Sequence, residues 1–370
     1  MSIQSDSQAN RTQARLALSR LFSPPTTMIT KGERTMTESN GNPRREFLGL
    51  AGKAGLSTVF AQAVGVNLGL VNVAQATSVK PFSFAMIADP HLYGAKDHVF
   101  DKQLEDAVLQ VNEMKQQPDF VVVLGDVSHN GELNELEKGK RILGNLRAPI
   151  RSIPGEHDWY LDMGAGWKAN FGDEFWSFDH KGVHFIGLNS ILVPDFWTKA
   201  GLTAEQRRDW FMPLNSPVPG VWGTDARQRE WLKKDVARLP TSTPIVIFTH
   251  SPLWDYYPRW NFQVSDAVQI RGILSKFTSV MAFHGHVHHT LYNKIGNMTS
   301  IGTMSTSWPW PYPPVKLPYP QFQQYRADPS NTSDGMGTAA VSITGPGAGR
   351  MQYAPFADSV PQRLIDGFKI

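Results

Sequence analysis

Short apolar runs that end in acidic or histidine side chains recur along the chain. Four of them are Phe82 to Asp89, Phe120 to Asp126, Ile150 to Asp158 and Pro244 to His250. Runs of this length predict buried strands that end in polar chemistry. Between them lie segments with helical periodicity, at Phe100 to Lys115, Glu132 to Leu146 and Asp225 to Leu239. In the last of these, Trp231, Leu232, Val236 and Leu239 share one face. Strands alternating with helices predict an α/β sheet covered on both faces.

The remaining patterned segments predict further strands. Phe175 to Asp179 and Val183 to Asn189 flank Lys181-Gly182 and are typical of a hairpin, and Val280 to His288 predicts a strand that runs into a His-rich turn. Residues 298–353 predict several short antiparallel strands. Two Pro- and Trp-rich segments, 192–222 and 307–324, are expected to be insertions or surface straps, which either frame a substrate cleft or cover apolar surface.

The N-terminal residues 1–76 differ from the rest. Residues 1–43 are polar without an apolar face, and they are followed by Arg44-Arg45, an apolar stretch from Gly49 to Val73, and Ala74-Gln75-Ala76. Five glycines between Gly49 and Gly69 disfavour the alternative of a stable buried or amphipathic helix. The pattern resembles a twin-arginine signal peptide. It implies recognition by the twin-arginine export machinery and a periplasmic or secreted mature domain, residues 77–370, without a membrane anchor.

Composition limits the partners and the metal ligands. The chain has 370 residues and no Cys, so any metal must be bound by oxygen and nitrogen atoms. Residues 1–76 hold eight Lys/Arg and four Asp/Glu, which leaves 28 basic and 29 acidic residues in the body. A neutral body argues against nucleic acid as a partner, although a small basic groove around Arg207, Arg208 and Arg259 stays open.

Five short motifs carry the candidate chemistry. They are Asp89-Pro90-His91, Gly125-Asp126, Gly155-Glu156-His157-Asp158, His250 and Gly285-His286-Val287-His288. A strand-end Asp is often a cap and a single His is often structural, so each motif alone is weak. Each one, however, falls at the end of a predicted strand, where α/β folds assemble their sites.

In this order the motifs resemble the calcineurin-like metallophosphoesterase family over residues 82 to 289. The resemblance implies an α/β sandwich of mixed central sheets flanked by helices, with the site at the strand carboxyl ends. It also implies two divalent or trivalent metal ions, Fe, Mn or Zn, as cofactors. Asp126 matches the bridging ligand; Asp89, His91 and His288 match the other ligands of the first metal, and Glu156, His250 and His286 those of the second.

The reaction implied by the resemblance is hydrolysis of a small-molecule phosphate ester by a hydroxide held between the two ions. His157 matches the histidine that stabilises or protonates the leaving group, and Asp158 is expected to hold its imidazole in the required tautomer. Among the remaining histidines, His98, His129, His180, His284 and His289 are considered and receive no role. For His129 a supporting or surface position is favoured over a place in the cleft.

One residue departs from the family pattern, because Glu156 stands where Asn is usual. A Glu adds negative charge and removes an amide donor, which predicts a preference for monoanionic phosphodiesters over dianionic monoesters. Alternatively, Glu156 withdraws from the metal and water replaces it. Two other functions remain possible at this stage: a broad, acid-phosphatase-like phosphomonoesterase, or a non-catalytic protein that binds metal or another ligand on this scaffold.

Overall fold

The computed structural model describes residues 65–69, 79–192, 201–211, 222–256, 263–309, 335–345 and 348–356. All of them belong to one compact unit, Phe60–Ile370. The predicted Arg pair and cleavage site of the leader lie outside the described residues. Among the described residues, no helix has the length and apolar character needed to cross a membrane.

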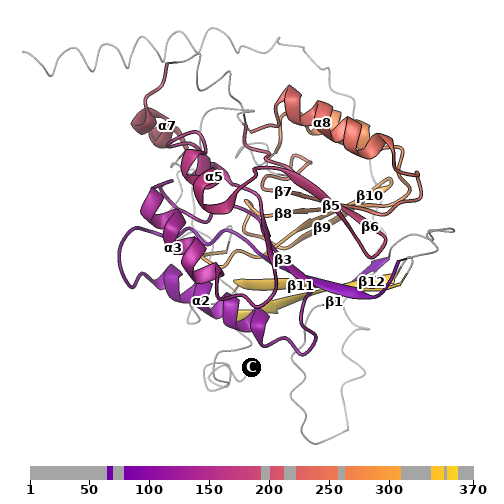
Figure 1. Ribbon diagram of the computed structural model, residues 1–370, viewed down its shortest axis with the longest axis horizontal. Coiled ribbons are helices and arrows are strands. Elements are labelled where there is room, and N and C mark those ends of the chain that lie inside the picture. The colour runs from indigo at the N-terminus through magenta and orange to yellow at the C-terminus, as the bar shows by residue number, and fades with distance from the viewer. Residues whose placement is uncertain are drawn as a thin grey trace, which may run out of the picture. The chain divides into compact units, whose positions relative to one another are not determined.

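Two six-stranded sheets form the centre of the unit (Figure 1). The first has the order β1 (Gly65–Gly69), β12 (Ala348–Pro355), β11 (Gly337–Gly345), β2 (Phe82–Ile87), β3 (Phe120–Val123) and β4 (Ile150–Ser152). The second has the order β5 (Trp176–His180), β6 (Val183–Gly187), β7 (Ile245–Thr249), β8 (Val280–His284), β10 (Met298–Gly302) and β9 (Leu291–Ile295).

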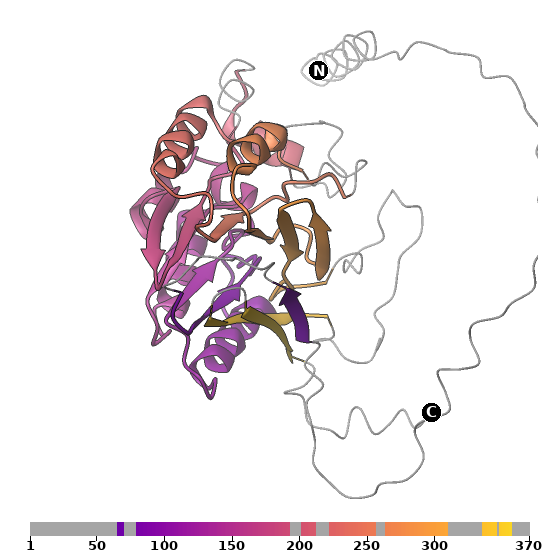
Figure 2. The ribbon, with the colours of Figure 1, turned by 90° about the vertical axis from the view of Figure 1, so that its right-hand side faces the viewer.

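Both sheets are mixed. In the first, β2, β3 and β4 run parallel, whereas β11, β12 and β1 join by antiparallel pairing. Strand β2 pairs with β11, and Figure 2 shows the indigo strands of the N-terminal part next to the yellow strands of the C-terminal part, although they come from opposite ends of the sequence. In the second, β6, β7, β8 and β10 are parallel and the edge strands β5 and β9 are antiparallel. The predicted hairpin is therefore confirmed, and the predicted antiparallel tail is confirmed for β11 and β12, whereas β10 is antiparallel to β9 but parallel to β8.

Alternate residues of the strands fill the space between the two sheets. Phe84 is fully buried there and packs its ring 5.3 Å from Phe120, 5.6 Å from Phe185 and 5.9 Å from Phe248. Burying an aromatic side chain of this size contributes about 1.5–3 kcal/mol each. The aromatic layer holds the sheets together and fixes where the strand ends lie.

Helices cover the outer faces (Figure 1). On the first sheet pack α2 (Val99–Asn112), α3 (Leu133–Leu143) and α5 (Ala165–Phe171), and on the second pack α8 (Ala226–Ala237) and α9 (Ala267–Leu274). Helix α8 begins at Asp225, whose side chain accepts a hydrogen bond from Gln228 N at 2.7 Å. It buries Leu232 and Val236, with Trp231 and Leu239 packed beside them, as the sequence predicted.

The main error of the sequence prediction concerns residues 150–158, which were expected to form one strand. Strand β4 ends at Ser152, and a short helix, α4 (Glu156–Trp159), begins three residues after Ile153. Pro154 has no N–H for pairing and Gly155 is the residue that begins the turn, so the strand cannot continue. The motif therefore presents its side chains from the first turn of a helix.

Two other predicted regions are only partly described. Helix α7 (Ala204–Phe211) lies within the first Pro- and Trp-rich segment, and most of both segments lies outside the described residues. Gly65–Gly69, inside the predicted apolar part of the leader, forms β1 and pairs with β12. The assignment of residues 1–76 to a leader stays a prediction.

Candidate metal centre

The seven predicted metal ligands meet at the carboxyl ends of β2, β3, β7 and β8 and at the start of α4. They are Asp89, His91, Asp126, Glu156, His250, His286 and His288, and each is at most 9 % exposed. Geometrically they form two adjacent groups with metal-binding spacing. Asp89, His91 and His288 make up one group, and Asp126, Glu156, His250 and His286 the other.

The backbone turns sharply at most of these positions. Asp89, His91, Asp126, His286 and His288 all have positive φ, between 50° and 62°. The left-handed conformation costs a residue with a side chain roughly 1–2 kcal/mol. Main-chain hydrogen bonds hold the turns, for example from Asp89 N to Gly125 O at 3.1 Å and from His91 N to Asp126 O at 2.8 Å. The sheets thus stabilise strained turns that bring the ligands to one point.

Three glycines of the motifs allow the ligands to approach each other. A Cβ on Gly125, whose φ is +88°, would lie 2.5 Å from Gly155 N. A Cβ on Gly155 would overlap the Asp126 carboxylate, and one on Gly285 would lie 2.7 Å from Asp89 Oδ2. Glycine is needed here because the neighbouring chain or ligand occupies the space of a side chain.

The first group, Asp89, His91 and His288, is rich in neutral imidazole. His288 donates from Nδ1 to the Trp308 carbonyl at 2.8 Å, so its Nε2 carries a lone pair. That Nε2 lies 3.1 Å from His91 Nε2 and 3.6 Å from Asp89 Oδ1. Burial lowers the pKa of His288 to about 3, and burial together with His157 lowers the pKa of His91. Both rings are therefore neutral, as metal ligands must be.

The second group is rich in carboxylate. His250 donates from Nδ1 to Leu124 O at 2.6 Å, and its Nε2 lies 3.0 Å from Glu156 Oε2 and 3.2 Å from Asp126 Oδ2. Glu156 Oε1 lies 2.8 Å from His286 Nδ1. Burial opposes the charge on Glu156, but the His286 and His250 rings hold its pKa well below the ordinary value. Glu156 therefore lies within the group, with one carboxylate oxygen facing each of the two histidines.

Asp126 lies between the two groups. Its Oδ2 is 3.5 Å from His91 Nε2 and 3.2 Å from His250 Nε2, while its Oδ1 accepts the His157 N–H at 3.0 Å. One oxygen thus faces a histidine of each group. This is the position that a bridging carboxylate requires.

The donor set fits cations. The carboxylates of Asp126 and Glu156 face His250 Nε2 and raise the pKa of His250, so the space between them requires a positive charge, which is either a proton on Nε2 or a metal ion. Among the described side chains, His250 Nε2, Glu156 Oε2 and Asp89 Oδ2 are buried without a hydrogen-bond partner. Burial, with the Asp126 charge added, raises the pKa of Asp89. Acceptors that face one another in a buried space are costly unless a positive ion lies between them.

His157 lies beside the first group, but the role predicted for Asp158 is wrong. His157 Nδ1 lies 2.6 Å from the backbone carbonyl of His129, not from Asp158. Asp158 instead accepts hydrogen bonds from Ser128 N at 2.8 Å and Gly155 N at 3.0 Å. It joins the loop after β3 to the start of α4, because a buried carboxylate is satisfied by the nearest free backbone N–H groups.

Four contacts of the site were not predicted, and three residues make them. His129 Nδ1 lies 3.2 Å from His91 Nδ1, and the Trp308 ring lies 4.4 Å from the His91 ring and 4.6 Å from the His288 ring. Trp222 packs its ring 5.4 Å from His286. Trp222 and Trp308 belong to the two Pro- and Trp-rich segments, so the described ends of both segments frame the site. The only signal in the sequence was their aromatic content.

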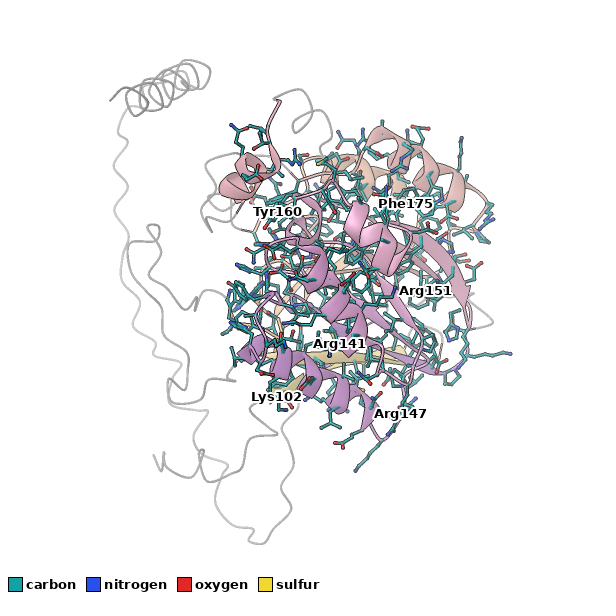
Figure 3. All side chains as sticks on the ribbon, turned by 60° about the vertical axis from the view of Figure 1, so that its left-hand side comes forward. Lys102, Arg141, Arg147, Arg151, Tyr160 and Phe175 are labelled. Carbon is teal, nitrogen blue, oxygen red and sulfur yellow. The ribbon has the colours of Figure 1, made fainter. Side chains whose placement is uncertain are left out.

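The basic groove considered around Arg207 gains no support from that residue. Its guanidinium donates hydrogen bonds to three backbone carbonyls, those of Tyr160 at 2.6 Å, Leu161 at 2.9 Å and Leu202 at 2.8 Å. Tyr160, labelled in Figure 3, ends α4, so Arg207 fastens α7 to the helix that carries Glu156. The side chains of Arg208 and Arg259 lie outside the described residues.

Comparisons with known proteins agree with this geometry. Residues 82–290 match the family model for the calcineurin-like phosphoesterase domain. A probable glycerophosphodiester phosphodiesterase GpdQ of Arcobacter nitrofigilis is 26% identical over 208 residues, which cover 54% of this chain and 68% of that protein. The serine/threonine-protein phosphatase CPPED1 of Homo sapiens is 26% identical over 281 residues, 66% of this chain and 81% of that protein.

A solved structure shares the fold. The dimetal phosphatase from Danio rerio superposes with a TM-score of 0.50 at 14% identity, covering 74% of this chain and 99% of that chain. At this identity the likeness supports the α/β sandwich predicted from the sequence and carries no information on the substrate.

Proposed function

Since the chain belongs to the calcineurin-like phosphoesterase family, we propose that it is an exported two-metal phosphoesterase that favours phosphodiesters over phosphomonoesters. The observation that carries the preference is the ionised, buried Glu156 within the second ligand group. The proposed metals are Fe, Mn or Zn, because carboxylate and imidazole donors without sulfur suit these ions.

The residues divide between the two ions as follows. Asp89, His91 and His288 would hold the first, Glu156, His250 and His286 the second, and Asp126 would contact both. When bound, the metal pair supplies a nucleophile at neutral pH and neutralises charge that develops on the phosphoryl group.

His157 is the candidate for proton transfer to the leaving oxygen. Its Nδ1 is fixed on the His129 carbonyl at 2.6 Å, and its backbone N–H is fixed on Asp126 Oδ1 at 3.0 Å. The ring therefore has one free nitrogen, Nε2, which can take up a proton from water and, in the doubly protonated ring, give it to an alkoxide as it departs. An alkoxide is a poor leaving group and needs this proton most. We therefore expect His157 to matter most for the hydrolysis of alkyl esters.

Glu156 supports the diester preference through charge. In place of a neutral amide it adds one negative charge at the second site, where a phosphate oxygen must bind. Two unit charges about 4 Å apart repel by on the order of 4 kcal/mol at an effective dielectric constant near 20, so a dianionic monoester is penalised more than a monoanionic diester. The Arcobacter nitrofigilis relative is named as a phosphodiesterase, which is consistent with this preference.

The test compares bis-p-nitrophenyl phosphate with p-nitrophenyl phosphate on the wild-type protein, on Glu156→Asn and on Glu156→Gln. We expect both substitutions to lower the diester-to-monoester ratio of kcat/KM by about tenfold or more. Glu156→Gln is the matched control, because it keeps the length of the side chain and removes the charge. An unchanged ratio in both variants would refute the charge argument even if total activity falls.

Export through the twin-arginine route is the second part of the proposal. It is supported by Arg44-Arg45, the Gly-rich apolar stretch and Ala74-Gln75-Ala76. Residues 1–78 fused to a reporter that is active only outside the cytoplasm should give signal, and the double substitution of Arg44 and Arg45 by Lys should abolish it. Since β1 precedes Ala76, N-terminal sequencing of the exported protein would also reveal whether β1 is retained.

A further inference from the structure

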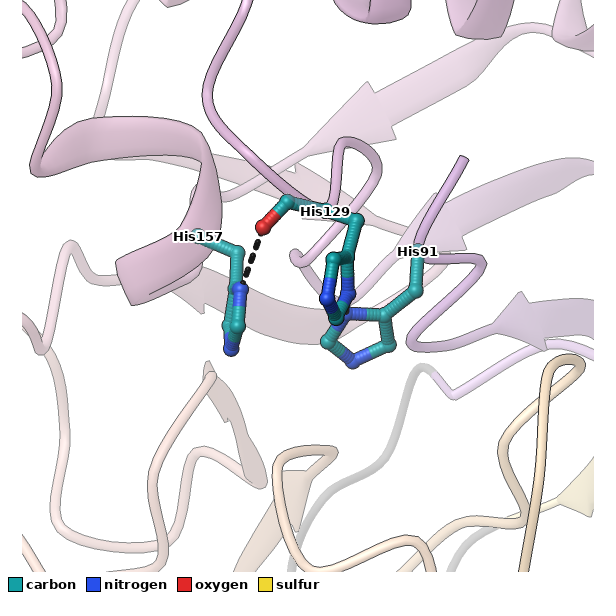
Figure 4. A group of neighbouring side chains, drawn as sticks. All are labelled: His91, His129 and His157. Carbon is teal, nitrogen blue, oxygen red and sulfur yellow. Dashed lines mark hydrogen bonds between the residues drawn. The ribbon is translucent and has the colours of Figure 1, made fainter. Parts of the chain in front are cut away.

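His129 contacts both a predicted metal ligand and the candidate proton donor. Its ring Nδ1 lies 3.2 Å from His91 Nδ1, and its backbone carbonyl lies 2.6 Å from His157 Nδ1 (Figure 4). The loops that follow β2 and β3 bring this about, because they continue the parallel pairing of the strands. Leu92 N donates to Val127 O at 2.9 Å, and His129 N donates back to Leu92 O at 2.9 Å.

The ring of His129 is held firmly in this place. It stacks at 4.3 Å between centroids on Tyr93 and at 5.1 Å on His157. The carbonyl of the same residue also accepts the Tyr160 hydroxyl at 3.1 Å. A ring packed on two sides and hydrogen-bonded through its own backbone can orient a neighbour with little loss of entropy.

The position of the proton on the His91 ring determines whether His129 donates or accepts a hydrogen bond there. A neutral imidazole that binds a metal through Nε2 must carry its proton on Nδ1. The nearest described acceptor for that proton is His129 Nδ1, which must then be unprotonated, with the His129 proton on Nε2. For the same reason His91 cannot serve a third ion through Nδ1, although His91, His129 and His157 lie close enough together to form a metal-binding group.

We propose that His129 is a positioning residue whose Nδ1 accepts a hydrogen bond from the protonated Nδ1 of His91. This hydrogen bond fixes the tautomer of His91 and leaves its Nε2 lone pair for the first metal. The backbone carbonyl of His129 fixes the tautomer of His157 in the same way, because it accepts a hydrogen bond from Nδ1 and leaves Nε2 free. The inference rests on the proposed metal centre and adds a residue that the five motifs do not contain. Loss of the side chain should weaken the first metal alone, because the carbonyl that orients His157 remains.

Two variants separate hydrogen bonding from packing. His129→Leu fills much of the space of the ring without an acceptor, whereas His129→Asn keeps an acceptor oxygen on the γ carbon. Apo protein titrated with Co²⁺ and followed by its visible spectrum should show two binding steps. We expect His129→Leu to weaken one step by about ten- to a hundredfold and leave the other within about twofold, and His129→Asn to recover most of the loss.

Three results would overturn the proposal. They are equal weakening of both steps in His129→Leu, equal behaviour of the Leu and Asn variants, and a wild-type protein that binds three Co²⁺ with His129→Leu binding two. The last would make His129 a ligand of its own ion. Failure of the wild-type protein to bind any metal would instead overturn the proposed function itself.

A measurement on the wild-type protein covers the case in which His129→Leu does not fold. Long-range ¹H–¹⁵N correlation of the Zn²⁺-loaded protein, with assignment by the Asn variant, reports which ring nitrogen carries the proton. We expect His91 to be protonated on Nδ1 and His129 on Nε2. A proton on Nδ1 of His129 would contradict the proposal.

Discussion

The two ligand groups of the metal centre are built differently. Behind the first group lie aromatic rings: Trp308 packs 4.4 Å from His91 and 4.6 Å from His288, and His129 contacts His91 from the other side. Beside the second group lies one such ring, Trp222, 5.4 Å from His286, and each group has a histidine held by a main-chain carbonyl, His288 by Trp308 at 2.8 Å and His250 by Leu124 at 2.6 Å. The first group has one carboxylate of its own, Asp89, and the second has Glu156 in addition to the shared Asp126.

This difference affects the charge that each site must balance. Burial lowers the pKa of His288 to about 3, whereas the pKa of His250 is raised, since its carboxylate neighbours Asp126 and Glu156 outweigh the effect of burial. A cation at either site relieves the repulsion between its own carboxylate and Asp126, and one at the first site also gains from the shape that two aromatic rings maintain. We therefore expect the first metal to depend on packing more than the second does.

The largest effect should come from the residue common to both groups. Asp126→Asn removes the shared charge, so we expect metal content to fall at both sites and kcat/KM to drop by about a thousandfold or more. Elemental analysis and ester turnover on the same preparation measure both quantities. Asp119→Asn is the matched control, because Asp119 pairs with His180 and Lys181 away from the site and should leave activity within about twofold. Retention of two metals in Asp126→Asn would contradict the bridging assignment.

Glycine substitutions should separate the groups with an intermediate effect. In Gly155→Ala the new Cβ meets the Asp126 carboxylate, and in Gly285→Ala it meets Asp89 Oδ2 at 2.7 Å. We expect Gly155→Ala to lower activity by about a hundredfold and affect both metals, and Gly285→Ala by about tenfold with the first metal alone weakened. Gly272→Ala in α9, where a Cβ meets nothing within 4 Å, is the control for helix stability. Equal loss in the two site variants would remove the distinction between the groups.

The smallest effect concerns the aromatic support of the first group. Trp308→Ala removes the ring beside His91 and His288 but keeps the carbonyl that accepts from His288 Nδ1. We expect the first metal to bind about three- to tenfold more weakly, with the second unchanged, and Trp308→Phe to restore most of the affinity. Two-step metal titration decides the point. A change in the affinity of the second metal in Trp308→Ala would show that the ring supports both sites and not the first alone.

The strand ends and their ligands could be predicted from the sequence, because buried parallel strands leave a clear apolar run and the motifs follow each run directly. The contacts of supporting residues could not, although a supporting or surface position was favoured for His129. His129 lies 38 positions from His91, and Trp308 lies 20 from His288, and nothing in either local pattern distinguishes a supporting ring from a surface ring. Helix α4 was missed for a different reason, since Ile150 to Ser152 does form the predicted strand and only Pro154-Gly155 marks the break.

The prediction for Asp158 failed because it assumed that residues adjacent in a motif also contact each other in the structure. Asp158 follows His157 in the chain, but in the first turn of a helix neighbouring side chains point away from each other. The carboxylate therefore meets the backbone of Ser128 and Gly155. Correct prediction of this contact would have required knowing that the segment is helical.

The positive φ of Asp89, His91, Asp126, His286 and His288 has a consequence for mutational scanning of this enzyme. At each position the loss of function in a library mixes two causes, removal of a ligand and misfit of the new side chain to a left-handed main chain. Asn and Gly tolerate that conformation and isolate the chemical cause, whereas Val, Ile and Thr add a conformational penalty of their own. The difference in retained activity between the Asn and Val variants at one position would measure how strongly the surrounding fold imposes the left-handed conformation there.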